Sequence, residues 1–147
     1  MKVLKFGGTS VGSVESIRQI QQIIAQQSDD CVVVVSALGG ITDQLLHAAH
    51  LALQADDTYM EVYQTIRQRH LDMANSLIDN MTTRQMLCHE LENILDELRS
   101  ILFGVHLVKD LSAKSEAAIV SYGEQLSSRI VTAALPGAVR KDSLQFI

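Results

Sequence analysis

The chain has 147 residues, 47% of them hydrophobic, and its 12 Lys and Arg against 17 Asp and Glu give a net charge of −5. That composition is too apolar for an intrinsically disordered protein and is enough for one domain with its own core. The acidic balance, the absence of a Lys/Arg cluster and the few aromatic residues disfavour nucleic-acid binding. No apolar run approaches the about 20 residues that cross a bilayer, and Lys5 interrupts any signal-like start, so we expect a cytoplasmic protein without membrane association.

The first 35 residues predict a βαβ unit. Lys2–Phe6 is typical of a short strand, and apolar residues recur at helical spacing from Val14 to Ile24, with Ser13 as a candidate helix cap. The β-branched run at Cys31–Val35 favours a strand buried on both faces, as in a parallel sheet. This order of elements predicts an α/β fold.

The middle of the chain is predicted to be helical. A helix is expected over Thr42–Leu53, and two more over Thr58–Leu77 and Arg84–Phe103, which would form a helical insertion at about 56–110 in the α/β frame. Apolar residues from Leu87 to Leu102 form a stripe in the last of these. The stripe predicts an intrachain core face, with a dimer seam as the less frequent alternative.

The final third predicts one more helix and a short strand. The helix is expected over about 112–135, interrupted at Gly123 and ended sharply by Leu135, Pro136 and Gly137. Ala138–Lys141 then has the pattern of a strand.

A cationic glycine loop follows the first predicted strand. Gly7 and Gly8 let the backbone approach a ligand, and amides near a helix N-terminus, here with Thr9 and Ser10, favour an anion. Lys5 adds a positive charge, so the loop is a candidate nucleotide phosphate site. The lysine precedes the glycines, so this is not a Walker A loop. By residues alone, a plain tight turn is as good an interpretation.

A second loop, at Ser36–Thr42, follows the second predicted strand. Ligands of open parallel sheets bind beyond the carboxyl ends of the strands, so both loops are expected to face one crevice. The hydroxyls of Ser36 and Thr42 would suit a small polar ligand. Thr42 is an equally good helix N-cap, and the two roles are compatible.

Glu124 has two interpretations. Ser121 and Glu124 have capping-box spacing, which by spacing alone is the better explanation. The functional alternative is a carboxylate that binds a substrate ammonium group. Gly123, between them, indicates a close approach of another segment or a break in the helix, because glycine costs about 1 kcal/mol in a helix interior.

No metal site is predicted. His47 and His50 stand three residues apart, a spacing that a solvated helix face explains better than an incomplete zinc site. Cys31 and Cys88 have no metal-ligand spacing, and a buried free thiol is the better interpretation of Cys31.

The string Lys-Phe-Gly-Gly-Thr-Ser-Val at 5–11 resembles the opening motif of aspartate kinases, within the amino acid kinase family. Three further stretches agree in order: Val35–Thr42, Ser121–Ser128 and the terminal segment with Asp142. The resemblance implies a three-layer α/β/α fold with a parallel-rich sheet, of which residues 1–147 would be the N-terminal part of the catalytic domain. It allows a monofunctional enzyme or one fused to homoserine dehydrogenase, and it allows a homodimer.

The resemblance also implies the reaction, in which the γ-phosphate of ATP, bound with Mg²⁺, passes to the side-chain carboxylate of L-aspartate. The product, 4-phospho-L-aspartate, opens lysine, threonine and methionine biosynthesis. By position, Lys5 would contact the transferring phosphate, and Gly7, Gly8, Thr9 and Ser10 would line the phosphate loop. Ser36, Thr42 and Glu124 would contact aspartate, with Glu124 near its ammonium group.

Aspartate kinases also carry an adenine site, a second glycine-rich segment, a catalytic Asp and a carboxylate-binding Arg, and the 147 residues contain no match to them. We therefore expect a fragment without kinase activity of its own. The alternative from another class is a non-catalytic anion-binding or oligomerisation module of the same fold. A dinucleotide oxidoreductase is a distant third, because the glycine spacing is wrong.

Overall fold

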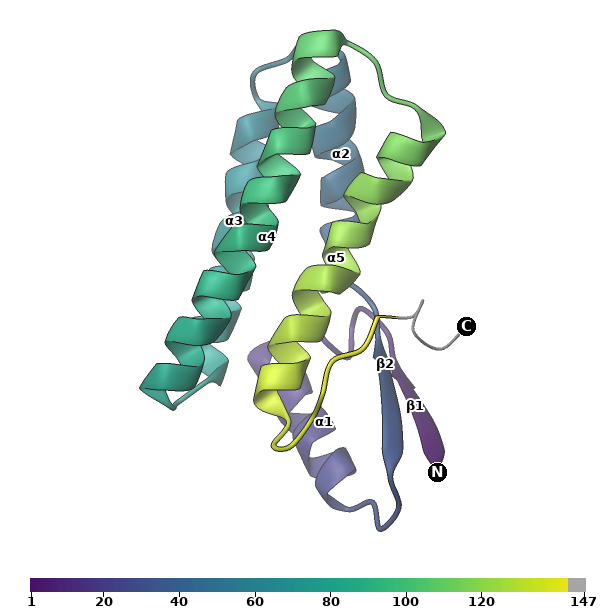
Figure 1. The fold of residues 1–147 in the computed structure, drawn as a ribbon, viewed down its shortest axis with the longest axis vertical. Coiled ribbons are helices and arrows are strands. Elements are labelled where there is room, and N and C mark those ends of the chain that lie inside the picture. The colour runs from purple at the N-terminus through teal and green to yellow at the C-terminus, as the bar shows by residue number, and fades with distance from the viewer. Residues whose placement is uncertain (143–147) are drawn as a thin grey trace.

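The computed structural model describes residues 1–142, which form two strands and five helices (Figure 1). In chain order these are β1 (Lys2–Phe6), α1 (Val14–Ala25), β2 (Cys31–Val35), α2 (Ile41–Leu53), α3 (Tyr59–Leu77), α4 (Met81–Val108) and α5 (Ala113–Ala134). The four helices α2 to α5 lie side by side as a bundle, and the strands with α1 lie at one end of it.

The βαβ unit predicted from the sequence is confirmed. β1 and β2 pair in parallel, with the register running from Lys2 opposite Cys31 to Phe6 opposite Val35. Ser13 caps α1: its hydroxyl accepts from the Ser16 amide, and the Ser16 hydroxyl accepts from the Ser13 amide. This reciprocal pair satisfies two of the amides that a helix start leaves without partners.

The two faces of the sheet differ in burial. Phe6, Val33 and Val35 pack against the hydrophobic core. On the opposite face Val3 is 68% exposed and Val34 is 43% exposed. The prediction that the valine run is buried on both faces is therefore wrong for residues 1–142, because this part of the chain places its core against one face of the strands.

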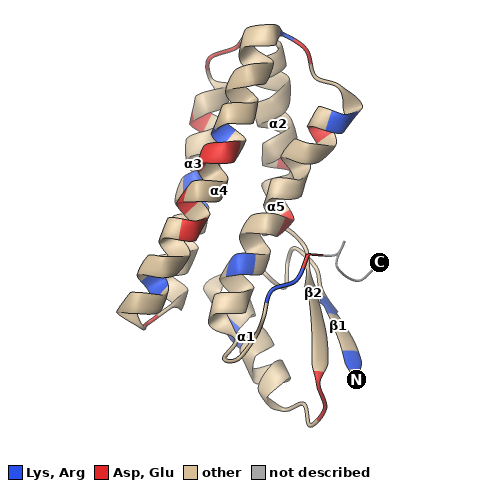
Figure 2. Ribbon diagram, viewed as in Figure 1, with Lys and Arg blue, Asp and Glu red and all other residues tan. Residues whose placement is uncertain are grey.

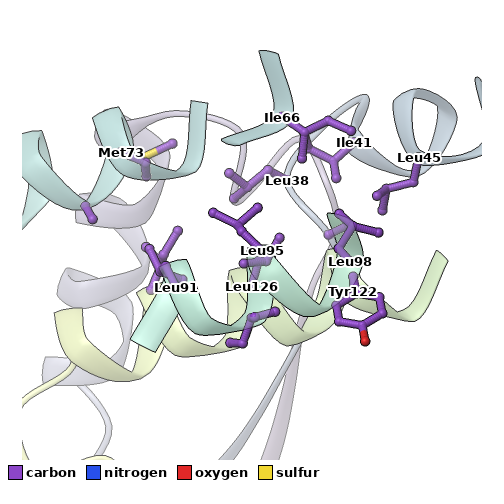
Figure 3. Close-up of a cluster of buried hydrophobic side chains, with 14 of the residues drawn as sticks. Leu38, Ile41, Leu45, Ile66, Met73, Leu91, Leu95, Leu98, Tyr122 and Leu126 are labelled. Carbon is purple, nitrogen blue, oxygen red and sulfur yellow. The ribbon is translucent and has the colours of Figure 1, made fainter. Parts of the chain in front are cut away.

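α4 carries the predicted apolar stripe but is longer than expected. It begins after Asn80, whose side chain accepts from the Thr83 amide, and it ends before Lys109, which takes a left-handed conformation with φ of 57°. The stripe points into the interior of the chain (Figure 3). Its buried members are Leu87, Leu91, Ile94, Leu98 and Leu102. The intrachain core face is thus confirmed, and the dimer-seam alternative for this stripe is wrong.

Acidic and basic positions are interspersed along α3 and α4 (Figure 2). Arg67 of α3 forms an ion pair with Glu92 of α4, and Arg129 of α5 reaches Glu90 of α4 at 2.8 Å. Each such partly exposed pair contributes at most about 1 kcal/mol. The buried apolar side chains therefore carry most of the packing energy between these helices.

α5 corrects two predictions. It begins after Ser112, whose hydroxyl accepts from the Ser115 amide, so Ser121 lies in the helix interior and is no N-cap. Its hydroxyl donates instead to the Ala118 carbonyl at 2.6 Å. The helix also passes through Gly123 without a break, so the predicted interruption is wrong.

The predicted strand at Ala138–Lys141 is absent. α5 ends at Ala134, and the Ala138 amide donates to the Leu135 carbonyl at 3.1 Å, closing a turn that includes Gly137 with φ of 76°. The following residues to Asp142 have no regular structure. A strand requires a neighbour for its ladder, and no segment within residues 1–142 pairs with this one.

Gly123 marks a close approach, which was the other interpretation of this residue. A Cβ atom built on Gly123 would lie 2.7 Å from the Ala37 Cβ and 3.4 Å from a Leu45 methyl group. Real Cβ atoms do not come so near to each other, so a side chain here would push α5 away from the start of α2. Glycine therefore lets α5 touch the loop that follows β2.

A pair of glycine substitutions tests this contact. Gly104→Ala, in α4, adds a Cβ with nothing within 4 Å and should stabilise the fold by up to about 1 kcal/mol through helix propensity. Gly123→Ala gains the same propensity but must displace α5, so we expect net destabilisation by about 1–3 kcal/mol. Urea unfolding followed by circular dichroism measures both. Equal stabilisation by the two changes would contradict the packing described.

Candidate functional site

The loops that follow β1 and β2 touch each other at the carboxyl-end edge of the sheet. A Cβ on Gly8 would lie 3.3 Å from the Ala37 carbonyl oxygen and 3.4 Å from the Gly39 Cα, and a Cβ on Gly39 would lie 3.1 Å from the Gly8 carbonyl oxygen. The two backbones are thus packed directly on one another. The two glycine loops therefore meet at one edge of the sheet, as expected, and a common ligand site there stays a prediction.

The first loop has amides available for a ligand. Its turn is closed by the Gly7 carbonyl, which accepts from the Ser10 amide at 3.0 Å and the Val11 amide at 3.2 Å. The amides of Gly8 and Thr9 donate to no group within residues 1–142. Two adjacent free amides beside a helix start suit an anion such as a phosphate.

Lys5 lies near the end of β1, with an exposed side chain. It shares a sheet face with Val3, and the register sets it opposite Val34, so it projects from the face that the core does not cover. Its ammonium has no ion-pair or hydrogen-bond partner in the described part of the chain. A solvated, unpaired cation therefore stands two residues before Gly7.

Ser36 links the second loop to both the sheet and α5. Its amide donates to the Phe6 carbonyl at 3.1 Å, and its carbonyl accepts from the buried Ser127 hydroxyl at 2.6 Å. Thr42 is exposed in the first turn of α2. The N-cap of α2 is Gly40, with φ of 83°, so the alternative that made Thr42 the cap is wrong. The helix starts at Ile41, two residues earlier than a cap at Thr42 requires.

Glu124 lies on α5 with an exposed side chain. Gly123 contacts Ala37, and Ser127 donates to Ser36, so both hold this stretch of α5 against the second loop. Glu124 stands three positions before Ser127, so it emerges on the exposed side of α5 next to the residue that bonds to the loop. Its carboxylate makes no ion pair within residues 1–142 and remains available for a cationic group.

Arg69 of α3 is a component of this region that the sequence interpretation missed. Its guanidinium donates to the Gly39 carbonyl in the second loop and, at 3.3 Å, to the Gly12 carbonyl in the first. Burial lowers the pKa of Arg69 from its ordinary value. No local pattern marks it, because its partners stand 30 and 57 positions away in the chain.

His70, the next residue, is fully buried. Its Nδ1 pairs with the Ile66 carbonyl at 2.7 Å, and its Nε2 has no partner within residues 1–142. Burial lowers its pKa from 6.5 to about 4, and the nearby Arg69 acts in the same direction. The ring is therefore neutral at pH 7. It belongs to the buried interior and adds no charge next to Arg69.

Residues 1–142 contain neither a helix that could span a membrane nor a cluster of metal-ligand side chains. None of the helices combines the length and the apolar character that a membrane span requires. No three or more His, Cys, Asp or Glu side chains gather as metal ligands in this range. His47 and His50 are both exposed on α2, and His50 pairs with Glu116 at 3.2 Å.

Comparison with known proteins identifies relatives of the whole described region. The model of the amino acid kinase family matches residues 1–142. Aspartokinase 2, chloroplastic, from Arabidopsis thaliana is 32% identical over 137 residues, which cover 90% of this chain and 24% of that protein. The Arabidopsis bifunctional aspartokinase/homoserine dehydrogenase 2, chloroplastic, is 29% identical over 144 residues, which cover 97% of this chain and 15% of that protein.

Solved structures show the same fold. Escherichia coli aspartokinase III in complex with aspartate and ADP superimposes with a TM-score of 0.80 at 24% identity, covering 91% of this chain and 28% of that one. The same enzyme with lysine and aspartate gives 0.78 at 23% identity. The chain thus has the fold of the corresponding part of these enzymes, and it spans about a quarter or less of the length of the curated relatives given above.

The Ser127 to Ser36 hydrogen bond can be tested by removing the hydroxyl. Ser127→Ala leaves the Ser36 carbonyl without this donor, so we expect a loss of about 1–2 kcal/mol in the free energy of unfolding. Ser121→Ala is the matched control on the same helix, because its exposed hydroxyl bonds only within α5, to the Ala118 carbonyl and the Gln125 side chain. That change should stay within about 0.5 kcal/mol. Equal effects in urea unfolding would contradict the role given to Ser127.

His70 predicts a pH dependence of stability. Between pH 6.5 and about 4 the unfolded chain binds a proton at this ring that the folded chain does not, so stability falls as the pH is lowered through this window. The loss should reach up to about 3 kcal/mol. His70→Asn should flatten the free energy of unfolding between pH 6.5 and 4, which urea unfolding at each pH measures. A slope that survives His70→Asn would refute this assignment.

Proposed function

This chain belongs to the amino acid kinase family, and we propose that it carries the phosphate-binding loop and part of the substrate pocket of an aspartate kinase. The reaction is the transfer of the ATP γ-phosphate to the side-chain carboxylate of L-aspartate. The observation that carries the proposal is the direct contact between the two glycine loops at the ends of β1 and β2. It sets the loop with the free amides directly against the loop that runs from Ser36 to Thr42.

The first loop is proposed to hold the nucleotide phosphates. The free amides of Gly8 and Thr9, with Gly7 and Ser10 completing the turn, fit phosphate oxygens, and the unpaired ammonium of Lys5 adds a full positive charge at the strand exit. Phosphoryl transfer relies on alignment and on neutralising charge. Mg²⁺ bound to the nucleotide would supply further neutralisation and would reach the site on the phosphates.

The second loop and α5 are proposed to hold aspartate. Ser36 and Thr42 stand at the two ends of the loop, and Glu124 lies beside it on α5 with a carboxylate suited to the substrate ammonium. The nucleophile is the side-chain carboxylate of aspartate, which is ionised at neutral pH, so no general base is needed. The role of these three residues is to orient that carboxylate toward the phosphate held by the neighbouring loop.

Binding measurements with matched variants test these roles. Lys5→Ala should weaken Mg·ATP binding by roughly tenfold or more and leave aspartate affinity unchanged. Glu124→Ala should weaken aspartate binding by a similar factor and leave Mg·ATP affinity unchanged. Lys2→Ala, on the same strand but bonded to Gln27, and Glu116→Ala, on the same helix but paired with His50, are the controls. Calorimetric titration of each ligand measures all four.

The outcomes separate the candidate functions. Nucleotide binding that depends on Lys5, together with no aspartate binding, would favour the non-catalytic anion-binding module over the kinase. If Lys5→Ala and Lys2→Ala weakened nucleotide binding equally, the phosphate site would lie elsewhere. An ADP-release assay on the same samples tests the sequence-based expectation that the chain alone has no turnover.

A further inference from the structure

A single guanidinium joins the two loops of the proposed site. Arg69 Nη1 donates to the Gly39 carbonyl, and Nη2 donates to the Gly12 carbonyl at 3.3 Å. The two nitrogens of the planar arginine fork reach the two acceptors in a fixed geometry, whereas a lysine would have to donate to both carbonyls from one nitrogen. The bridge comes from α3, so a helix outside the βαβ unit sets the relation between its two loops.

The bond to Gly39 fixes the orientation of one peptide group. In a trans peptide the carbonyl and the following amide point in opposite directions, so a Gly39 carbonyl turned toward Arg69 directs the Gly40 amide away from α3. The Gly40 amide has no acceptor within residues 1–142. This peptide lies between two glycines. Because glycine has no Cβ, the backbone dihedrals on both sides of the peptide are less restricted than they would be with other residues. The Ile41 amide closes the turn onto the Leu38 carbonyl at 3.0 Å, and Arg69 is the donor that bonds to the carbonyl between the two glycines.

Arg69 is itself held in place by the core. Ile66, one turn earlier on α3, is fully buried and lies close to Leu38 and Ile41, the residues on either side of Gly39 and Gly40 (Figure 3). His70 on the other side is also fully buried. The guanidinium packs against the turn at Gly39 and Gly40. A Cβ atom built on either glycine would lie 4.0 Å from one of its nitrogens.

We propose that Arg69 is a positioning residue that fixes the Gly39–Gly40 peptide and ties it to the phosphate loop, so that the loops present one continuous ligand site. The inference rests on the proposed function for its ligands, though the bridge itself is independent of it. Arg69 acts through the carbonyls of Gly12 and Gly39 and does not touch the reacting groups. Its charge, behind the two loops, also favours anionic ligands there.

The test compares Arg69→Met, Arg69→Lys and the control Arg67→Met, which removes an arginine two residues away that pairs with Glu92. The first measurement is the amide NMR spectrum of the ligand-free chain. Arg69→Met should shift the Gly40 and Ser13 amides, each of which follows a carbonyl that loses its donor, more than any amide of α4. Arg69→Lys should restore one of these two signals at most, and Arg67→Met should leave both unchanged.

The second measurement is the affinity for Mg·ATP and for aspartate. Arg69→Met should weaken both by roughly tenfold, since loss of a charged hydrogen bond disorganises both loops, and Arg67→Met should weaken neither. If Arg69→Met and Arg67→Met gave the same amide shifts at Gly40 and Ser13, or the same affinities, the proposal would be overturned. A wild-type chain that binds neither ligand would contradict the proposed function, and the amide spectra would still decide on Arg69.

Discussion

The contact between the backbones of Gly8 and Gly39 is the constraint on which the rest of the site depends. A Cβ at either position would meet the backbone of the other loop at 3.1–3.4 Å, which is tighter than ordinary van der Waals contact, so a side chain there would push the two loops apart. The contact requires that β1 and β2 be adjacent and parallel, so that both loops leave the sheet at the same edge. It then joins a loop with free amides to the loop that runs from Ser36 to Thr42, and the proposed function assigns the phosphate to the first loop and the acceptor to the second.

The helices are part of this arrangement and do more than cover it. α3 supplies Arg69, which bonds to both loops, and α5 supplies Ser127 and the close approach at Gly123. Their buried faces share one hydrophobic cluster with Leu38 and Ile41 beside the second loop. Packing energy from the bundle therefore restrains the loops, because a displacement of α3 or α5 would break hydrogen bonds to loop carbonyls.

The sequence predicted correctly those features that depend on interactions between residues close together in the chain. The glycine loops, the Ser13 cap and the stripe of α4 each depend on residues close together in the sequence, and each is present. The capping box at Ser121 failed because a better cap at Ser112 starts the helix earlier, and buried positions such as Ile119 and Leu126 carry it through. Arg69 could not be predicted, because its role depends on carbonyls far away in the sequence. The site roles drawn from the resemblance stay predictions.

The central claim is that the touching loops form one site with a phosphate half and an aspartate half. NMR titration of the uniformly ¹⁵N-labelled chain tests it most directly, because amide shifts locate even weak binding. Mg·ATP should shift the amides of residues 7–10, aspartate should shift those of residues 36–42 and Glu124, and α4 should remain unchanged with either ligand. Shifts from Mg·ATP concentrated away from the two loops, for instance around the surface arginines Arg129 and Arg140, would contradict the account.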